Sequence, residues 1–162
     1  MSLSLEFRCL NSKVEVNAAH QLEEAGYSAD EGASLERMLY RYTHARHLFL
    51  GAFDTHTGSL VGYVMATQAA APLVTHKSMG EHDPQGTTAC VHSVCVSRQW
   101  QRKGVATQLL EKYTEMIREY NRHSKVQITR LAMMAREDLV PLYQRTGYKC
   151  LGPSLVTHGK MP

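Results

Sequence analysis

Residues 101–106 read Gln101-Arg102-Lys103-Gly104-Val105-Ala106, and they follow the β-rich run Cys90-Val91-His92-Ser93-Val94-Cys95-Val96. The residues after them carry apolar side chains at helical spacing. Where a strand leads into a helix, the first backbone N–H groups of the helix have no partner inside it, and the helix dipole favours an anion there. Gly104 and Ala106 let a ligand come close to the backbone, and Arg102 and Lys103 add positive charge. This segment therefore predicts either a phosphate-binding turn or a simple basic turn at the start of a helix.

The spacing of this turn excludes two common nucleotide sites. It is neither G-x-G-x-x-G nor G-x-x-x-x-G-K-[ST], so it supports neither a dinucleotide-binding fold nor a P-loop ATPase.

The flanking sequence predicts an α/β domain with a mixed sheet. Alternation of apolar and polar residues, or β-rich composition, predicts strands over 3–10, 48–53, 60–65, 90–96, 126–134, 148–151 and 155–157. Helical spacing predicts helices over 14–25, from a capping box at 28–31 onward, over about 105–120, and over 139–145. Residues 69–86 show no periodicity and contain prolines and glycines, so we expect one long loop there.

Composition limits the chain to one ordinary globular domain over residues 1–162, with 43% hydrophobic and 20% charged residues. No apolar run approaches the ~20 residues of a membrane helix, so we expect no membrane partner. The net charge of +3 is mild, and no basic face with interleaved aromatics indicates nucleic-acid binding. Four cysteines form no C-x-x-C pair and no signal peptide is visible, which predicts free thiols and a cytoplasmic location. The oligomeric state stays open.

The phosphate turn and the strand before it resemble the acetyl-CoA signature of the GCN5-related N-acetyltransferase (GNAT) superfamily. The resemblance extends in collinear order to residues 6–10, 92–96, 139–148 and 152–153, and within the superfamily the chain is similar to the arylalkylamine N-acetyltransferases. It implies the GNAT acyl-CoA N-acyltransferase fold, in which a mixed, mostly antiparallel sheet is flanked by helices. It also implies direct transfer from acetyl-CoA, as co-substrate, to a small primary amine in a ternary complex.

The resemblance also assigns residues. It places the pyrophosphate on the backbone of the signature, and the pantetheine arm along the strand before it with the Val94 N–H near the thioester oxygen. The cofactor-binding residues are thus Val94, Cys95, Val96, Gln101, Arg102, Lys103, Gly104, Val105, Ala106 and Thr107. Because an alkylamine arrives protonated at neutral pH, a base is needed, and His92 matches a family histidine. Tyr143 matches the general acid that protonates the departing thiolate.

Three further positions concern the substrate. Met134 matches a position near the acyl group, and Tyr27 either stacks on an aromatic substrate or fills the core. Cys90 stands where some relatives have a second histidine, which puts a two-histidine mechanism in doubt; no basic partner marks it as an acylated nucleophile. No H-E-x-x-H motif or Cys/His cluster predicts a metal site.

Two rival hypotheses stay open at this stage. The first keeps the fold and changes the acceptor to a polyamine, or to a lysine or N-terminal amine of a protein. The second is a non-catalytic acyl-CoA-binding module that has kept the phosphate turn and lost turnover. The presence of both His92 and Tyr143 argues against the second.

Overall fold

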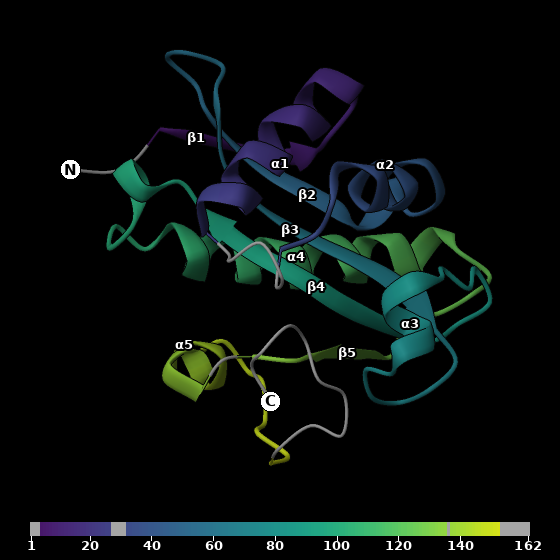
Figure 1. Cartoon of the computed structure of the whole chain (residues 1–162). Helices are drawn as coiled ribbons and strands as arrows, with labels where there is room; N and C mark the ends of the chain where they lie inside the picture. Colours follow the sequence, from purple (N-terminus) through teal and green to yellow (C-terminus); the bar gives the residue numbers. More distant parts are fainter. Residues whose placement is uncertain (1–3, 27–31, 136, 153–162) are drawn as a thin grey trace.

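A five-stranded sheet organises the computed structural model, which describes residues 4–26, 32–135 and 137–152 (Figure 1). The strands lie in the order β1 (Leu5–Cys9), β2 (Phe49–Asp54), β3 (Leu60–Ala69), β4 (Thr88–Val96) and β5 (Arg130–Met133). The first four pair antiparallel, whereas β4 and β5 pair parallel. A parallel pair needs a long crossover connection, which α4 (Val105–His123) supplies here. The expected mixed, mostly antiparallel sheet is confirmed.

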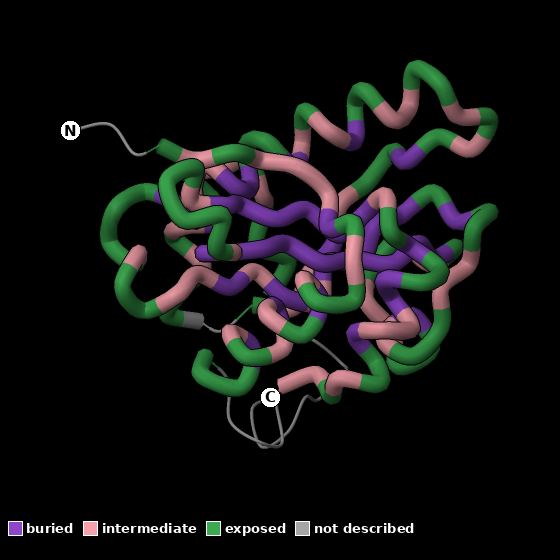
Figure 2. The backbone as a smooth tube through the Cα atoms, turned by 90° about the horizontal axis from the view of Figure 1, so that it is seen from above, coloured by how far each residue is buried: buried purple, intermediate pink, exposed green. Residues whose placement is uncertain are grey.

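Helices cover both faces of the sheet. In Figure 1, α1 (Lys13–Gly26) and α2 (Leu35–His44) lie on one side of the strands and α4 lies on the other. Figure 2 shows the buried strands running through the middle of the molecule, with exposed backbone around them. The remaining helices are short: the 3₁₀ turns Arg46–Leu48, Arg98–Trp100 and Glu137–Leu139, and the α-helices α3 (His76–Gly80) and α5 (Val140–Arg145).

The alternation of side chains along β3 divides the core in two. Val64 and Ala66 join a cluster with Leu109 and Tyr113 of α4, whereas Tyr63 and Met65 join a second cluster beneath α1 and α2. Successive side chains of a strand point to opposite faces, so a strand with apolar side chains on both faces must be covered on both sides. This explains why β3 is buried at nearly every position.

Several elements begin or end differently from the sequence predictions. The predicted capping box at 28–31 lies outside the described residues. The described α2 begins later, at Leu35, where the Ser34 hydroxyl accepts a hydrogen bond from the Arg37 N–H at 3.1 Å. The strand predicted over 126–134 is confined to Arg130–Met133.

Two further predictions were wrong. The expected long loop over 69–86 contains α3, whose capping box joins Thr75 and Ser78. The strand predicted over 148–151 does not form. Gly147 turns the chain with φ +103°, and the Tyr148 N–H then bonds back to the Tyr143 carbonyl at 3.0 Å. The strand predicted over 155–157 lies outside the described residues.

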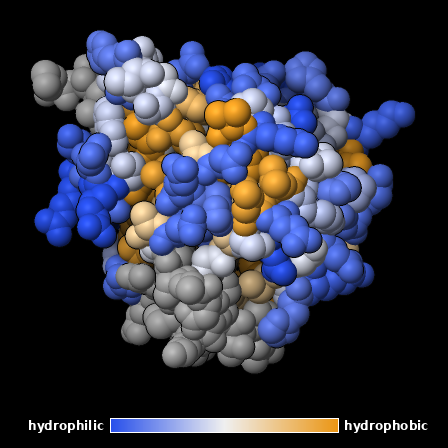
Figure 3. Space-filling view, turned by 45° about the horizontal axis from the view of Figure 1, so that its top comes forward, coloured by the Kyte–Doolittle hydropathy of each residue, from blue (hydrophilic) through white to orange (hydrophobic). Residues whose placement is uncertain are grey.

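One face of the molecule carries both hydrophilic and apolar side chains (Figure 3). Figure 3 shows hydrophilic side chains over most of one face, with apolar side chains showing between them. In the described part of the chain, no helix is both long and apolar enough to cross a bilayer.

Candidate active site

The site lies where β4 extends beyond β5. Their pairing ends at Val91 and Met133, but β4 continues over residues 92–96. On its other side β4 carries an irregularity, because Met65 pairs with Ser93 while Ala66 pairs with Val91. His92 is therefore the extra residue of a β-bulge. Bulges redirect a side chain out of the regular alternation, and they are frequent beside active sites.

A hydrogen-bond chain orients the His92 ring. Its Nε2 lies 2.8 Å from the Thr67 hydroxyl, and that hydroxyl donates to the Ser78 carbonyl at 3.1 Å. A threonine hydroxyl has a single proton to donate. When the Thr67 hydroxyl gives its proton to Ser78, Nε2 of His92 is the donor in the bond between the ring and Thr67.

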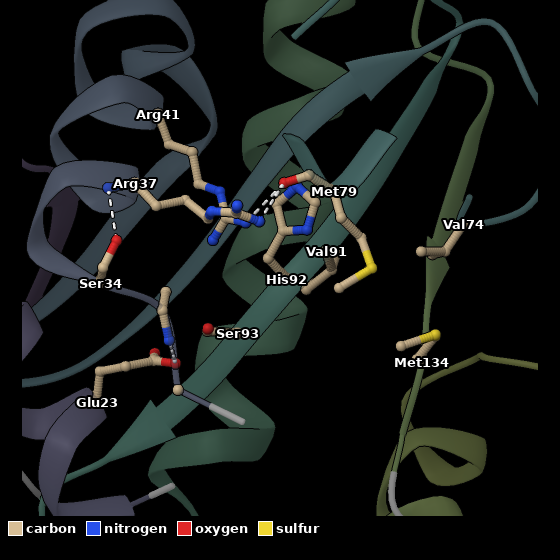
Figure 4. Close-up of a pocket in the computed structure, with 12 residues that line it drawn as sticks. Glu23, Ser34, Arg37, Arg41, Val74, Met79, Val91, His92, Ser93 and Met134 are labelled. Atoms are coloured by element: carbon tan, nitrogen blue, oxygen red, sulfur yellow. Dashed lines mark hydrogen bonds between the residues drawn. The ribbon is translucent and has the colours of Figure 1, made fainter. Parts of the chain in front are cut away.

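His92 and Met134 face a common cavity of about 320 Å³. Figure 4 shows side chains from α1, α2, β4 and the segment after β5 around this space, with Met79 of α3 beside them. The lining residues are Glu23, Gly32, Ala33, Ser34, Arg37, Arg41, Val74, Met79, Val91, His92, Ser93 and Met134. A concave space beside a bulged strand suits a small acceptor molecule.

Two arginines of α2 enter this cavity, and the sequence analysis did not identify them. Arg41 is only 3% exposed and donates to the Met79 carbonyl at 3.0 Å, and Arg37 donates to the same oxygen at 3.3 Å. Burial lowers the pKa of Arg41 to about 10, and the positive charge of Arg37 acts in the same direction. Both guanidinium groups thus hold the C-terminal end of α3.

Glu23 of α1 is the second unexpected group. Its side chain is 2% exposed and accepts hydrogen bonds from the Tyr63 hydroxyl and from the Ala33 N–H, the latter at 3.0 Å. A sequence signal exists, because Glu23 shares helical spacing with the buried Val16 and Ala19. A charged residue on an otherwise core-facing stripe is an uncommon feature that points to a site.

The basic turn has the geometry that a phosphate ligand needs. Arg102 and Gly104 both adopt positive φ, +61° and +80°, and Gly104 precedes the first residue of α4. The Gln101 side chain donates to the Val96 carbonyl at 3.1 Å and fixes the turn to the end of β4. Around the Cβ position of Gly104 there is open space.

Among the sequence-predicted cofactor residues, those of 101–104 are exposed, and Ala106 and Thr107 are half-buried. The Val105 side chain belongs to the α4 core, so only its backbone can face a ligand. A helix of this length begins with N–H groups that have no partner within it, which suits a pyrophosphate. The residues present therefore fit acetyl-CoA.

The strand residues next to this turn differ in exposure. Val94 and Val96 are half-buried against the α4 cluster, and Cys95 is buried on the opposite face. The Cys95 thiol donates to the Leu22 carbonyl at 3.3 Å, and burial raises its pKa to about 12. The Cys95 side chain is therefore chemically inert at neutral pH.

Other predicted residues lie elsewhere. Tyr143 is buried in α5, its ring edge-on to Tyr148 with 6.0 Å between ring centres, and it is not among the residues that line the cavity. Cys90 is fully buried in β4, and burial raises the pKa of its thiol. Tyr27 lies outside the described residues. Within the described part of the chain, no three His, Cys, Asp or Glu side chains gather as a metal site would require.

Comparison with known proteins supports the assignment to the GNAT superfamily that the sequence motifs predicted. Residues 33–160 match the family model "Acetyltransferase (GNAT) domain". The hamster (Mesocricetus auratus) serotonin N-acetyltransferase is 27% identical over 159 residues, which cover 96% of this chain and 73% of that protein.

Solved structures share the fold. Ard1 from Thermoplasma volcanium aligns with a TM-score of 0.66 at 16% identity, over 93% of this chain and 86% of that one. Glucosamine-6-phosphate N-acetyltransferase from Arabidopsis thaliana aligns with a TM-score of 0.64 at 9% identity, over 95% and 97%. The family match, the fold and the phosphate turn together make this chain a member of the GNAT family, an acetyl-CoA-dependent N-acetyltransferase.

Proposed function

We propose that this enzyme transfers the acetyl group of acetyl-CoA to a small primary amine of the arylalkylamine type, by direct attack within a ternary complex. The observation that carries the proposal is the cavity that joins His92 to Met134 beside the extended half of β4. The similarity to serotonin N-acetyltransferases favours an arylalkylamine as acceptor.

His92 is the proposed base. An alkylamine has a pKa near ~10.4, so it must lose a proton before its lone pair can attack a thioester. The bond between Nε2 and the Thr67 hydroxyl holds the imidazole at the cavity, where it is proposed to accept that proton directly or through a water.

The remaining roles concern the thioester. Acetyl-CoA supplies the activated acetyl group. The Val94 N–H is proposed to polarise the thioester carbonyl, and Tyr143 to return a proton to the departing thiolate. The buried thiols of Cys90 and Cys95, whose pKa values are raised, favour direct transfer over an acyl-enzyme route.

The experiment that tests the function is release of free CoA thiol from acetyl-CoA. Tryptamine, phenethylamine, spermidine and a lysine peptide are compared with a blank that lacks amine. We expect rapid release with the aromatic amines. Dependence on spermidine or on the peptide would keep the fold and change the acceptor, and CoA binding without any release would favour a non-catalytic module.

The base assignment predicts a pH-dependent defect in His92→Gln. We expect a loss of about a hundredfold in turnover near pH 7, shrinking as the pH approaches about 10, where free amine is already abundant. The measurement is a pH–rate profile with saturating acetyl-CoA, and His56→Gln in the exposed β2–β3 turn serves as control. A loss that is equal at every pH would contradict the assignment.

The acid assignment predicts that Tyr143→Phe lowers turnover by about tenfold or more while CoA affinity stays nearly unchanged. The substitution removes only a hydroxyl group from a buried ring, so the packing is kept. Tyr148→Phe removes a hydroxyl from the neighbouring ring of the same pair and is the matched control. Full activity in Tyr143→Phe would remove this residue from the mechanism.

A further inference from the structure

Glu23 is a buried carboxylate that the chemistry described so far does not use. It lines the acceptor cavity with 2% of its surface exposed. Among the described residues, no lysine, arginine or histidine lies within ion-pair distance of it. Leaving a buried negative charge without a cation is costly unless something else compensates for it.

The protein itself compensates for this charge only in part. The Tyr63 hydroxyl and the Ala33 N–H are its two hydrogen-bond donors, whereas an ionised carboxylate offers about four acceptor positions. Glu23 also lies in the last turn of α1, where the helix dipole is negative and disfavours an anion. That turn contains no basic residue. The Glu23 carboxylate can therefore accept further hydrogen bonds from a bound cation.

The positive groups of the cavity bond to the protein elsewhere, although the charge of Glu23 acts to raise the pKa of Arg41, which burial lowers, and the Arg41 Nε has no hydrogen-bond partner among the described residues. Arg37 and Arg41 both donate to the Met79 carbonyl, at the C-terminal end of α3. Figure 4 shows their guanidinium groups directed to this oxygen, while Glu23 lies apart from them on the α1 side of the cavity. His92 is the remaining titratable group of the lining, on the strand between these two regions.

We propose that Glu23 is the residue that recognises the acceptor, binding the ammonium group of the incoming amine through a charge-assisted hydrogen bond. This inference rests on the proposed function, because it assumes that the acceptor occupies this cavity. The amine enters as a cation, is held by the Glu23 carboxylate, and gives one N–H proton to His92 before its lone pair attacks. The enzyme would therefore select basic amines by their charge before it deprotonates them.

A series of ligands with one skeleton tests the proposal in the unmodified enzyme. Tryptamine carries a cation, tryptophol a neutral hydroxyl and indole-3-acetic acid an anion, and their binding to the CoA-bound enzyme is measured by calorimetry. We expect tryptamine to bind on the order of tenfold or more tightly than tryptophol, and the acid to bind most weakly. The reverse order would mean that the arginines dominate recognition, and it would overturn the proposal.

Glu23→Gln keeps the shape of the side chain and one of its two oxygen acceptors, which can still accept from the Ala33 N–H while the amide NH2 donates to the Tyr63 hydroxyl, and it removes the charge. We expect the dissociation constant of tryptamine to rise about tenfold to a hundredfold while that of tryptophol stays unchanged. Glu24→Gln, on the exposed side of the same helix, is the matched control, because the Glu24 side chain is 67% exposed. Equal losses for the amine and the alcohol would indicate a structural role and would contradict the proposal.

Measurements of binding and of turnover distinguish a failure of this inference from a failure of the proposed function. Charge-dependent binding of tryptamine without acetyl transfer would disprove the function and keep the recognition site. Acetyl transfer to tryptamine that is insensitive to Glu23→Gln, in a variant with an unchanged thermal unfolding curve, would support the function and disprove the recognition role of Glu23.

Discussion

At the scale of single residues, a substitution of Cys90 distinguishes direct transfer from an acyl-enzyme route. It lies on β4 two positions before His92, but its thiol is fully buried and burial raises its pKa. We therefore expect Cys90→Ala to keep acetyl transfer within about twofold while losing on the order of 1 kcal/mol of stability, because only a small buried group is removed. Steady-state rates and urea denaturation measure the two effects.

Labelling of the native protein gives an independent check on Cys90. A maleimide reagent should modify Cys150, which is exposed, and leave Cys90 intact in the mass spectrum. An acetylated Cys90 after incubation with acetyl-CoA alone would contradict direct transfer.

At the level of residues, the sequence allowed predictions only where a motif carries the signal, and the roles of those residues stay predictions. His92 and Met134 were found through their places in family motifs, and the structure brings both to one cavity. Glu23 and Arg41 were missed because neither belongs to a motif, and the one signal for Glu23 is its helical spacing with buried residues of α1. Their importance arises from which helices meet over β4, and that is a property of tertiary packing.

At the scale of elements, we expect the binding of the amine to depend on the N-terminal cap of α3. The Thr75 hydroxyl accepts from the Ser78 N–H at 3.0 Å, and the Ser78 hydroxyl accepts from the Thr75 N–H at 2.8 Å. Thr75→Ala removes this cap, a change that costs about 1 kcal/mol in typical helices. Because Met79 and Val74 line the acceptor cavity, we expect the KM for the amine to rise several-fold and the KM for acetyl-CoA to stay constant.

Two-substrate kinetics measures the effect of Thr75→Ala, and Thr57→Ala is its control. Thr57 makes a similar turn contact, with Asp54 at 3.0 Å, but it lies in the β2–β3 hairpin and does not line the cavity. If both variants raised the amine KM equally, general destabilisation would explain the result and α3 would have no specific role.

The long elements were predictable, and among the short helices the sequence predicted α5 but not α3. The apolar stripe of α4 extends over enough residues to show a period, and two apolar runs around a turn-rich stretch indicate the β2–β3 hairpin. The helix α3 has a single turn of five residues, which is too short for any period, and tertiary hydrogen bonds from Arg41 and Thr67 hold it. After Gly147, β propensity predicted a strand, but the chain folds back on Tyr143 instead.

At the scale of the whole molecule, the site arises where the sheet changes from antiparallel to parallel pairing. Three antiparallel pairings are followed by a parallel one, so α4 must cross the sheet and begin beside the end of β4. That crossover places the phosphate turn and the extended half of β4 at the same end. The sequence order of elements indicated this arrangement, but only the structure shows that β5 stops at Met133 and leaves β4 to continue.

The stability of the whole fold should depend on pH through His82. Burial lowers the pKa of this imidazole to about 4, the positive charges of His47 and His44 act in the same direction, and Asp83 opposes them. An unfolded histidine titrates near ~6.5, so at lower pH the unfolded chain takes up a proton that the folded chain does not. The free energy of unfolding should therefore fall between about pH 6.5 and about pH 4, by at most about 3 kcal/mol.

Urea denaturation across this pH range measures the loss, and two variants identify its origin. The ring Nδ1 of His82 accepts from the Gln68 N–H at 3.0 Å, and the carboxamide oxygen in His82→Asn can accept the same bond. Because asparagine does not titrate, we expect this variant to show a flatter dependence on pH. His56→Asn, in the exposed hairpin turn, should keep the wild-type slope. Parallel pH profiles for His82→Asn and the wild type would show that groups other than His82 cause the loss.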